Sequence, residues 1–361
     1  MRIGLVGAGR IGAFHAATLA KHPDVGELMV ADADPLRARE VAAAHGASAL
    51  SVDALFDSRL DALVIASATA AHAGLIAKAA QAGLPAFCEK PLALDLAGTI
   101  AALAVVEAAG AVLQIGFQRR FDPGYRAARA ALRAGRLGRL HTVRTVSSDP
   151  SPPPAAYVPL SGGLYRDCLI HDFDLLRWIT GREITEVYAI GTNVGADFFR
   201  AAGDADTAAV VLTLEDGILA TSTATRYHAA GYDVRMELAG TEDQFAVGLG
   251  PRTPLRPAEA PGAPAERDPY AEPATARRLS PWPGFLERFA SAYRAELATF
   301  LHVARGTEPN PCEGREALRA LLVAEACETS RREGRPVAVA EVESAARTYA
   351  DAVGGVKGVP A

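Results

Sequence analysis

Short apolar runs alternate with longer, helix-like segments along the first third of the chain. The apolar runs are typical of buried parallel strands and cover residues 2–6, 28–31, 62–67, 85–89 and 111–117. The segments with helical length and patterning are 13–21, 35–44, 51–57, 70–82 and 97–109. This alternation predicts an α/β domain over residues 1–120, in which helices cover both faces of a doubly wound parallel sheet of the Rossmann type.

Beyond Pro123 the pattern is that of a second, different domain. One helix runs to Gly135, and a strand at 140–146, a proline-rich loop at 149–159 and a helix over 168–180 follow. Four β-like runs between short turns then predict an antiparallel sheet, at 186–192, 208–214, 218–225 and 233–240. Residues 251–283 predict a long loop, and two helices, 285–305 and 313–334, complete an α+β domain over 121–361.

The composition is that of a soluble enzyme with two hydrophobic cores. The chain has 361 residues, of which half are apolar, and that is enough for two cores. A formal net charge of −5, without basic runs, disfavours nucleic acid as a partner. No apolar run could span a membrane and no charged leader precedes the first strand, so we expect a cytoplasmic protein. The four cysteines are scattered and predict neither a zinc site nor disulfides.

The first apolar run leads directly into three closely spaced glycines. Gly7 allows a tight turn, Gly9 lets the backbone approach a pyrophosphate, and Gly12 lets the next helix pack closely with its N-terminus toward the phosphates. Asp32 ends the second apolar run, where a carboxylate would accept hydrogen bonds from ribose hydroxyls and repel a 2′-phosphate. The pattern predicts a dinucleotide site that prefers NAD to NADP. Arg37 could soften that preference, but it is more typical of a solvated helix residue.

A lysine lies at the carboxyl end of the run 85–89, in the segment Phe87-Cys88-Glu89-Lys90-Pro91. Active sites of open parallel sheets lie outside such strand ends. Because Pro91 prevents a helix from starting at Lys90, we expect the lysine side chain to project into the crevice where a nicotinamide would lie. A lone lysine in a turn is more often a surface residue, but the position of Lys90 beside Glu89 and Pro91 favours a role in the site.

An aspartate and a histidine lie one helical turn apart further along the chain. If a helix begins at Asp167, then Asp167 and His171 share one face. Oxidation of an alcohol needs a base for the hydroxyl proton, and histidine titrates near neutral pH, so His171 is the candidate base. The alternatives are a helix N-cap for Asp167 and a structural buried histidine for His171. Asp172 and Asp174 could suggest a metal site, but they fall on other helix faces and we predict none.

Together these motifs resemble those of the Gfo/Idh/MocA oxidoreductases, a family named for glucose–fructose oxidoreductase, inositol dehydrogenase and a rhizopine catabolism protein. The resemblance rests on Gly7–Gly12, on Glu89-Lys90-Pro91 and on the Gly-Gly-x3-Asp-x3-His pattern of Gly162–His171. It implies a Rossmann domain followed by an α+β domain with a large, open, mainly antiparallel sheet. One face of that sheet covers the active site in the family, and the other commonly forms a homo-oligomer, here a dimer or tetramer.

The resemblance also implies a role for each matching residue. Lys90 would hold and polarise the substrate hydroxyl, His171 would be the acid/base, and Asp167 would bind substrate and support proton transfer. The implied contacts to the cofactor NAD are Gly7, Ala8, Gly9, Arg10, Ile11, Gly12, Asp32, Thr69, His72, Glu89, Lys90 and Gln118.

Within the family the chain is most similar to inositol 2-dehydrogenases. The segment 115–125 resembles the run that follows the last parallel strand in those enzymes, and 231–233 and 289–293 are also similar. This likeness implies substrate contacts at Arg119 and Tyr232 in addition to Lys90, Asp167 and His171. The segment 161–166, which should line the substrate pocket, does not clearly match.

The expected activity is NAD-dependent oxidation of a secondary alcohol of a cyclitol or sugar to a ketone, with myo-inositol or an isomer giving an inosose. A pyranose or an aminocyclitol remains open as substrate. Two other functions are open, an NAD-dependent glycosidase or lyase on the same fold and a non-catalytic nicotinamide sensor. A sensor would not need Lys90, Asp167 and His171 together. We expect a small polyol as partner, and neither nucleic acid nor a membrane.

Overall fold

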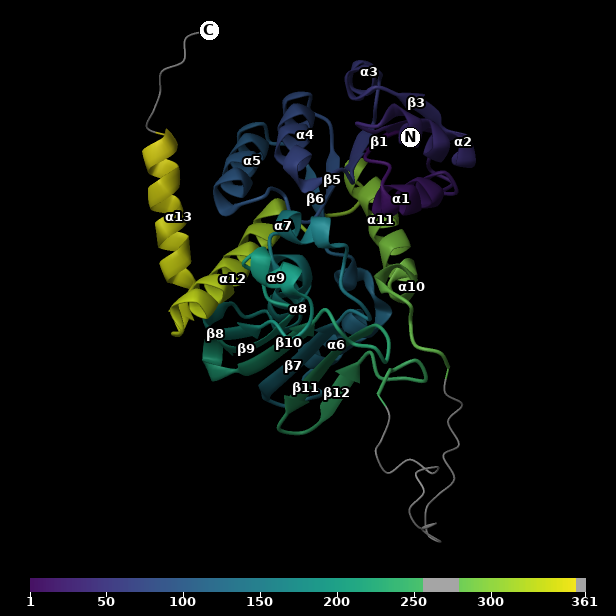
Figure 1. Ribbon diagram of the computed structural model, residues 1–361. Coiled ribbons are helices and arrows are strands. Elements are labelled where there is room, and N and C mark those ends of the chain that lie inside the picture. The colour runs from purple at the N-terminus through teal and green to yellow at the C-terminus, as the bar shows by residue number, and fades with distance from the viewer. Residues whose placement is uncertain (256–278, 355–361) are drawn as a thin grey trace.

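The computed structural model describes residues 1–255 and 279–354, with side chains up to residue 346. Most of the predicted loop at 251–283 falls on residues 256–278 and therefore lies outside the described residues. The described chain forms a parallel α/β part and a mixed-sheet part, one above the other (Figure 1).

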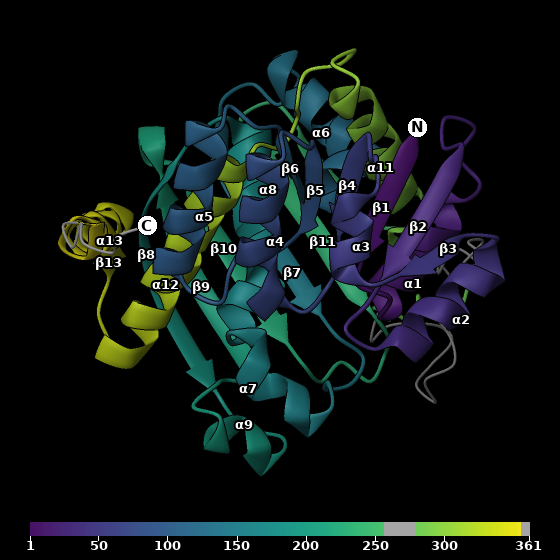
Figure 2. The ribbon, with the colours of Figure 1, turned by 90° about the horizontal axis from the view of Figure 1, so that it is seen from above.

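The first part is a six-stranded parallel sheet with the order β3-β2-β1-β4-β5-β6. Its strands are β1 (Arg2–Val6), β2 (Glu27–Ala31), β3 (Ser48–Leu50), β4 (Ala62–Ile65), β5 (Ala86–Glu89) and β6 (Leu113–Gly116). Its helices are α1 (Arg10–Leu19), α2 (Pro35–His45), α3 (Val52–Asp57), α4 (Thr69–Gln81) and α5 (Leu96–Ala108). Figure 2 shows the strands following one another in this order. The strand order reverses between β1 and β4, which places the binding crevice at their carboxyl ends.

The second part is a seven-stranded sheet with the order β12-β11-β7-β10-β9-β8-β13. Its strands are β7 (Leu140–Ser148), β8 (Ile184–Thr192), β9 (Thr207–Leu214), β10 (Leu219–Thr225), β11 (Asp233–Gly240), β12 (Gln244–Val247) and β13 (Val337–Ala338). All neighbouring strands are antiparallel except β7 and β10, which are parallel. The predicted fold class, a Rossmann domain with a mainly antiparallel sheet, is confirmed.

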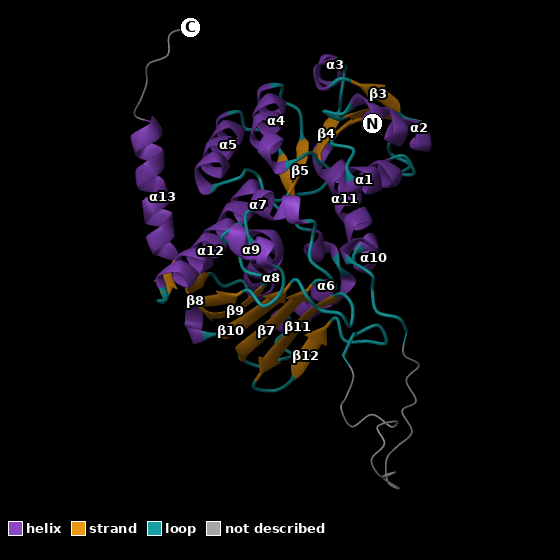
Figure 3. Ribbon diagram, viewed as in Figure 1, coloured by secondary structure: helices purple, strands orange, loops and turns teal. Residues whose placement is uncertain are grey.

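The described helices lie on one face of this second sheet (Figure 3). The helices of the second half are α6 (Pro123–Arg133), α7 (Val158–Ser161), α8 (Ile170–Thr180), α9 (Asp197–Ala201), α10 (Phe285–Arg288), α11 (Ala290–Ala304), α12 (Gly314–Glu333) and α13 (Val339–Gly354). Residues of the strands alternate between buried and exposed, as expected for a sheet with one solvated face. No helix among the described residues is long and apolar enough to cross a membrane.

The C-terminal helices return to the first part of the fold. Leu297, Phe300 and Leu301 of α11 pack with α1 and the first strands in one buried cluster. Ala317 and Leu321 of α12 pack in the cluster on the other face of the parallel sheet. The boundary at residue 120 remains a prediction, and these contacts show that residues after 290 contribute to the core of the parallel sheet.

Several elements differ from the sequence expectation. The short strands β3, β12 and β13 and the helices α9 and α13 were not predicted, and α13 is a third helix after the two expected in the last part of the chain. The proline-rich segment contains a 3₁₀ turn, Ala155–Tyr157, followed by α7. A π-helical turn, Tyr165–Leu169, precedes α8. The single helix predicted over 285–305 is interrupted at Phe289, where φ is −111° and ψ is 16°. The π-helical turn matters most for the site, because it carries Asp167, and such turns are frequent at functional sites.

Candidate active site

The glycine turn after β1 is tight enough to require glycine at two positions. A Cβ on Gly7, whose φ is +103°, would lie 2.4 Å from the backbone of Ala66, and a Cβ on Gly12 would lie 1.9 Å from the Gly7 carbonyl oxygen. A Cβ on Gly9 would meet no atom within 4 Å. The turn therefore packs closely against the protein on one side and leaves open space beside Gly9 at the start of α1. This arrangement fits the pyrophosphate of a dinucleotide.

Asp32 also holds the glycine turn in place. Its Oδ2 accepts a hydrogen bond from the backbone N–H of Ala8 at 2.6 Å, and its Oδ1 accepts one from that of Asp34 at 2.8 Å. Arg37 is an exposed residue of α2, as the sequence predicts, and its guanidinium also reaches Oδ1 at 3.4 Å. The carboxylate lies at the end of β2, where it fits a ribose of the cofactor.

The other predicted cofactor residues lie around this crevice with different surroundings. Thr69 is the first residue of α4 and is half-buried. His72 is buried, with Nδ1 2.7 Å from the carbonyl of Pro91 and Nε2 3.0 Å from that of Ser67, so its ring holds two loops together. Gln118 is also buried, and its Oε1 has no hydrogen-bond partner among the described residues.

Two further residues beside the glycine turn face the second half of the chain. The exposed Arg10 places its guanidinium 4.7 Å from the ring centre of Phe285, and Ile11 packs between two hydrophobic clusters.

Glu89, at the end of β5, is buried, and its Oε1 lies 2.7 Å from Nε2 of His15 on α1. The strand end that carries Lys90 is thereby fixed to the helix that begins at the glycine turn.

Lys90 and Asp167 meet at the carboxyl end of β5. The ammonium Nζ donates to the Asp167 carbonyl at 2.8 Å and lies 3.4 Å from its Oδ1. Burial raises the pKa of Asp167, but the charges of Lys90 and Arg226 outweigh it and hold that pKa below its ordinary value. Asp167 is therefore a carboxylate beside a cation, and this fits a pair that binds a substrate hydroxyl.

Two glycines make the turn that brings Asp167 to Lys90. Gly162 and Gly163 have φ angles of +81° and +91°, a backbone conformation that other residues rarely adopt. The buried Asp204 accepts a hydrogen bond from the N–H of Leu164 at 2.9 Å and fixes the start of the π-helical turn. The positive φ angles at these two positions thus explain why the motif has two glycines.

His171 lies on α8, one turn beyond Asp167. The side chain is buried, its ring is edge-on to Phe117, and its Nδ1 has no hydrogen-bond partner among the described residues. Burial, together with the positive charges of Lys90 and Arg119, lowers the pKa of His171 well below 6.5. The imidazole is therefore neutral at pH 7 and able to accept a proton, and its ionisation does not fall near neutrality as the residue type alone suggested.

Arg119 is buried and bound within the protein. Its Nη1 donates to Asp172 at 3.0 Å and to Ser147 at 3.1 Å. The next residue, Arg120, pairs with Asp174 in the same way. The two aspartates that could have suggested a metal site are thus engaged by arginines, and no group of residues that could hold a metal ion is found in the described part of the chain.

Three residues that sequence reasoning missed complete the network around Asp167. Arg226, just after β10, donates to Asp167 Oδ2 at 2.6 Å and to Asp149 Oδ2 at 2.9 Å. Tyr157, from the proline-rich segment, donates to Asp167 Oδ1 at 3.0 Å. None of the three belongs to a motif. Asp149 and Tyr157 lie in the segment after β7 and Arg226 lies after β10, so only the fold brings them to Asp167.

Arg226 is expected to position Asp167 rather than to touch substrate. In an Arg226→Gln variant the pKa of Asp167 should rise, because one of the two charges that lower it is lost, and kcat should fall about tenfold, the value of one charged hydrogen bond. The acid limb of the kcat/KM pH profile should move to higher pH, and Arg226→Lys should move it partly back. An unchanged profile in Arg226→Gln, with Arg200→Gln on α9 as control, would contradict this role.

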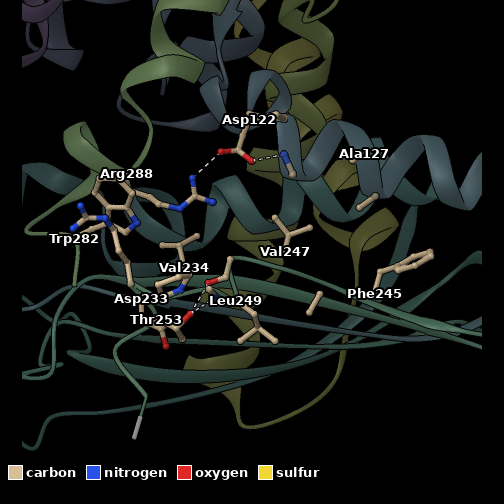
Figure 4. Close-up of a pocket in the computed structure, with 18 of the residues that line it drawn as sticks. Asp122, Ala127, Asp233, Val234, Phe245, Val247, Leu249, Thr253, Trp282 and Arg288 are labelled. Atoms are coloured by element: carbon tan, nitrogen blue, oxygen red, sulfur yellow. Dashed lines mark hydrogen bonds and ion pairs between the residues drawn. The ribbon is translucent and has the colours of Figure 1, made fainter. Parts of the chain in front are cut away.

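A separate pocket of about 640 Å³ lies between α6 and the edge strand β12 (Figure 4). Phe245, Val247 and Trp282 line it, and Arg288 donates to Asp122 at 2.7 Å at one end. Tyr232, a predicted substrate residue, also lines this pocket, whereas Lys90, Asp167 and His171 do not. The pocket is therefore separate from the Lys90–Asp167 pair and from His171.

Comparison with known proteins agrees with this geometry. The family model described as "Oxidoreductase family, NAD-binding Rossmann fold" matches residues 1–117, and the model for the GFO/IDH/MocA C-terminal domain matches residues 125–246. The chain belongs to the Gfo/Idh/MocA family of oxidoreductases. This membership confirms the resemblance inferred from the motifs and the prediction of NAD as the cofactor.

Relatives within the Gfo/Idh/MocA family include enzymes named for inositol. A myo-inositol dehydrogenase of Streptomyces leeuwenhoekii is 39% identical over 91% of this chain and 98% of its own length. The crystal structure of a putative myo-inositol dehydrogenase from Sinorhizobium meliloti has a TM-score of 0.84 at 35% identity, over 94% of this chain and 99% of that one. A scyllo-inositol dehydrogenase of Lactobacillus casei, solved with NAD(H) and scyllo-inositol, has a TM-score of 0.81 at 28% identity, over 94% and 99%.

Proposed function

We propose that this protein oxidises one hydroxyl of an inositol, or of a closely related cyclitol, to a ketone with NAD as the acceptor. The observation that carries the substrate class is the balance of charge in the cleft. Lys90, Arg119 and Arg226 are matched by Asp149, Asp167 and Asp172, each cation lying within 3.4 Å of a carboxylate. No cation of this set is left to bind a charged group, and the hydroxyls of a neutral polyol suit such a site.

The residues of the cleft divide the chemistry among them. Lys90 would hold the hydroxyl that reacts, and the neutral imidazole of His171 would take its proton. Asp167, held by Arg226 and Tyr157, would fix the position of Lys90 and bind a neighbouring hydroxyl. NAD, bound at the glycine turn and at Asp32, would supply the hydride acceptor. These roles draw support from the contacts above and from the named relatives.

A substrate panel tests the proposal. The purified protein is incubated with NAD and, separately, with myo-, scyllo- and chiro-inositol, glucose and glucuronate, and NADH is followed by its absorbance. We expect NADH with at least one inositol isomer and little with glucuronate, because a carboxylate would have to displace an existing ion pair. Turnover confined to the uronic acid would contradict the substrate class and leave family membership untouched.

The uncovered face of the second sheet is the proposed surface for a homo-oligomer of this cytoplasmic enzyme. Tyr188 and Ile190 on β8, Val211 on β9 and Leu219 on β10 are 41–55% exposed there. Tyr188 and Val211 are directly paired across the two strands. An apolar strip of this kind on the face that no described helix covers is typical of a surface that a second copy buries.

A charge on this strip is expected to dissociate the assembly. In Ile190→Asp/Val211→Asp, two carboxylates would be buried without partners, which costs several kcal/mol. Size-exclusion chromatography with light scattering should show a smaller species than for the unmodified chain. The control Leu36→Asp on α2, where Leu36 is 65% exposed, should have no effect. An unmodified chain that is already monomeric, or a double variant of unchanged mass, would refute this interface.

A further inference from the structure

Three arginines lie on one face of α6, away from the catalytic cleft. Arg126, Arg129 and Arg133 are separated by three and four residues, the spacing that places side chains on one side of a helix. None of them forms an ion pair with a carboxylate among residues 1–255 and 279–346, whereas most arginines of this chain do. Unpaired arginines gathered in one place are notable in a protein with a net charge of −5.

These arginines border a surface hollow of about 790 Å³ between α6, α8 and the segment before α12. Helices α6 and α8 lie side by side on the covered face of the second sheet (Figure 3). The floor of the hollow contains Arg120 and Arg177, whose charges are already taken up by Asp174, Glu183 and Glu316. The exposed Glu313 also lines the hollow. Among the described residues, positive charge without a carboxylate partner is therefore concentrated on the α6 side, where Arg126 donates only to the carbonyl of Arg120 and lies over the ring of Phe121.

Arg129 is the arginine held most firmly in this hollow. Its guanidinium lies 4.2 Å from the ring centre of Trp178 on α8, and its Nε is buried with no acceptor among the described residues. Burial, followed by the charges of Arg133 and Arg120, lowers the pKa of Arg129. A guanidinium that is fixed against a ring, lacks an acceptor and is repelled by its neighbours would be stabilised by an anion.

We propose that this hollow binds a small anion that carries phosphate groups. Arginine is the residue whose planar fork matches phosphate with paired hydrogen bonds. Arg129 would supply the fixed donor, and Arg126 and Arg133, both exposed, would close on the ligand from the rim. The site shares no lining residue with the glycine turn or with Lys90, Asp167 and His171, so the inference does not depend on the proposed function.

Fluorescence of Trp178 provides a local measurement of binding. The chain has two tryptophans, so Trp282→Phe leaves Trp178 as the only one. This variant, saturated with NAD so that the dinucleotide site is filled, is titrated with inorganic pyrophosphate at ionic strength held constant with sodium chloride. We expect a saturable change in Trp178 emission, and isothermal titration calorimetry on the chain without the tryptophan replacement should give the same dissociation constant.

Variants of the arginines that border the hollow then test whether pyrophosphate binds there. Arg129→Gln and Arg133→Gln should each weaken pyrophosphate binding about tenfold, the value of one hydrogen bond between charged groups, while Arg200→Gln on α9 should bind as the parent does. Arg133 is exposed, so its variant tests the site even if Arg129→Gln fails to fold. The proposal is overturned if pyrophosphate gives no saturable signal, if Arg133→Gln binds equally well, or if citrate binds as tightly as pyrophosphate.

Discussion

Replacement of His171 by alanine is expected to lower kcat for polyol oxidation by about 10² to 10⁴-fold while the affinity for NAD is retained. The reason is geometric, because His171 is the neutral imidazole one helical turn beyond Asp167, and the glycine turn proposed to bind NAD lies in another part of the fold, after β1. Lys90→Ala should lose at least as much, since Lys90 is the proposed donor to the reacting hydroxyl and its ammonium contacts Asp167. Steady-state kinetics on the preferred polyol, with NAD binding measured separately, checks both.

The pH dependence of the unmodified enzyme gives an independent test of the same residue. The pKa of His171 is lowered by burial and then by Lys90 and Arg119, so the neutral, proton-accepting form persists well below pH 6.5. The rate of oxidation should therefore be constant from pH 7 down through 6.5 and fall only at more acidic pH. A rate that still rises between pH 7 and 8 with one ionisation would contradict the lowered pKa of His171. Full activity of His171→Ala would show that His171 is a structural histidine.

The second large effect concerns the choice of cofactor. The carboxylate of Asp32 should repel a 2′-phosphate, so kcat/KM with NAD should exceed that with NADP by on the order of 10² or more, corresponding to a few kcal/mol of like-charge repulsion. In Asp32→Ala, kcat/KM with NAD should fall, and the ratio of kcat/KM with NAD to that with NADP should shrink to about tenfold or less. Arg37, 3.4 Å from Asp32, would then be free to approach the phosphate.

Two companion variants separate charge from structure at this position. Asp32→Asn removes the charge but keeps an oxygen that can accept from the N–H of Ala8, so it should narrow the cofactor ratio with less loss of NAD affinity than Asp32→Ala. Asp32→Ala/Arg37→Ala should recover less activity with NADP than Asp32→Ala alone. Equal kcat/KM for the two cofactors in the unmodified protein would contradict the assignment of Asp32.

The motifs could be predicted from the sequence because each is local. The glycines, Asp32 and Lys90 stand next to strand ends that hydrophobic patterning defines, and Asp167 and His171 are separated by one helical turn. The network around them could not be predicted, because Arg226 is 77 residues from Asp149 and 59 residues from Asp167 in the sequence, and it reaches both only when β7 and β10 pair in parallel.

The environment of the individual side chains could not be predicted from the sequence either. Arg119 and Arg120 are adjacent in the sequence and equally basic, yet both prove to be paired with aspartates of α8, and that pairing decides whether they can bind a charged substrate. The histidine pKa likewise depends on burial and on two cations from other elements. The residue type gives only the ordinary pKa, and the fold sets the direction in which that pKa is shifted.

Transfer of deuterium from a polyol to the nicotinamide tests the central claim most directly. The protein is incubated with NAD and myo-inositol deuterated at every ring carbon, and the reduced cofactor and the ketone are analysed by mass spectrometry. We predict a reduced cofactor heavier by one deuterium and an inosose that has lost one, with both signals absent in His171→Ala over the same period. Reduced cofactor without deuterium, or no inosose from any inositol isomer, would contradict the proposed oxidation.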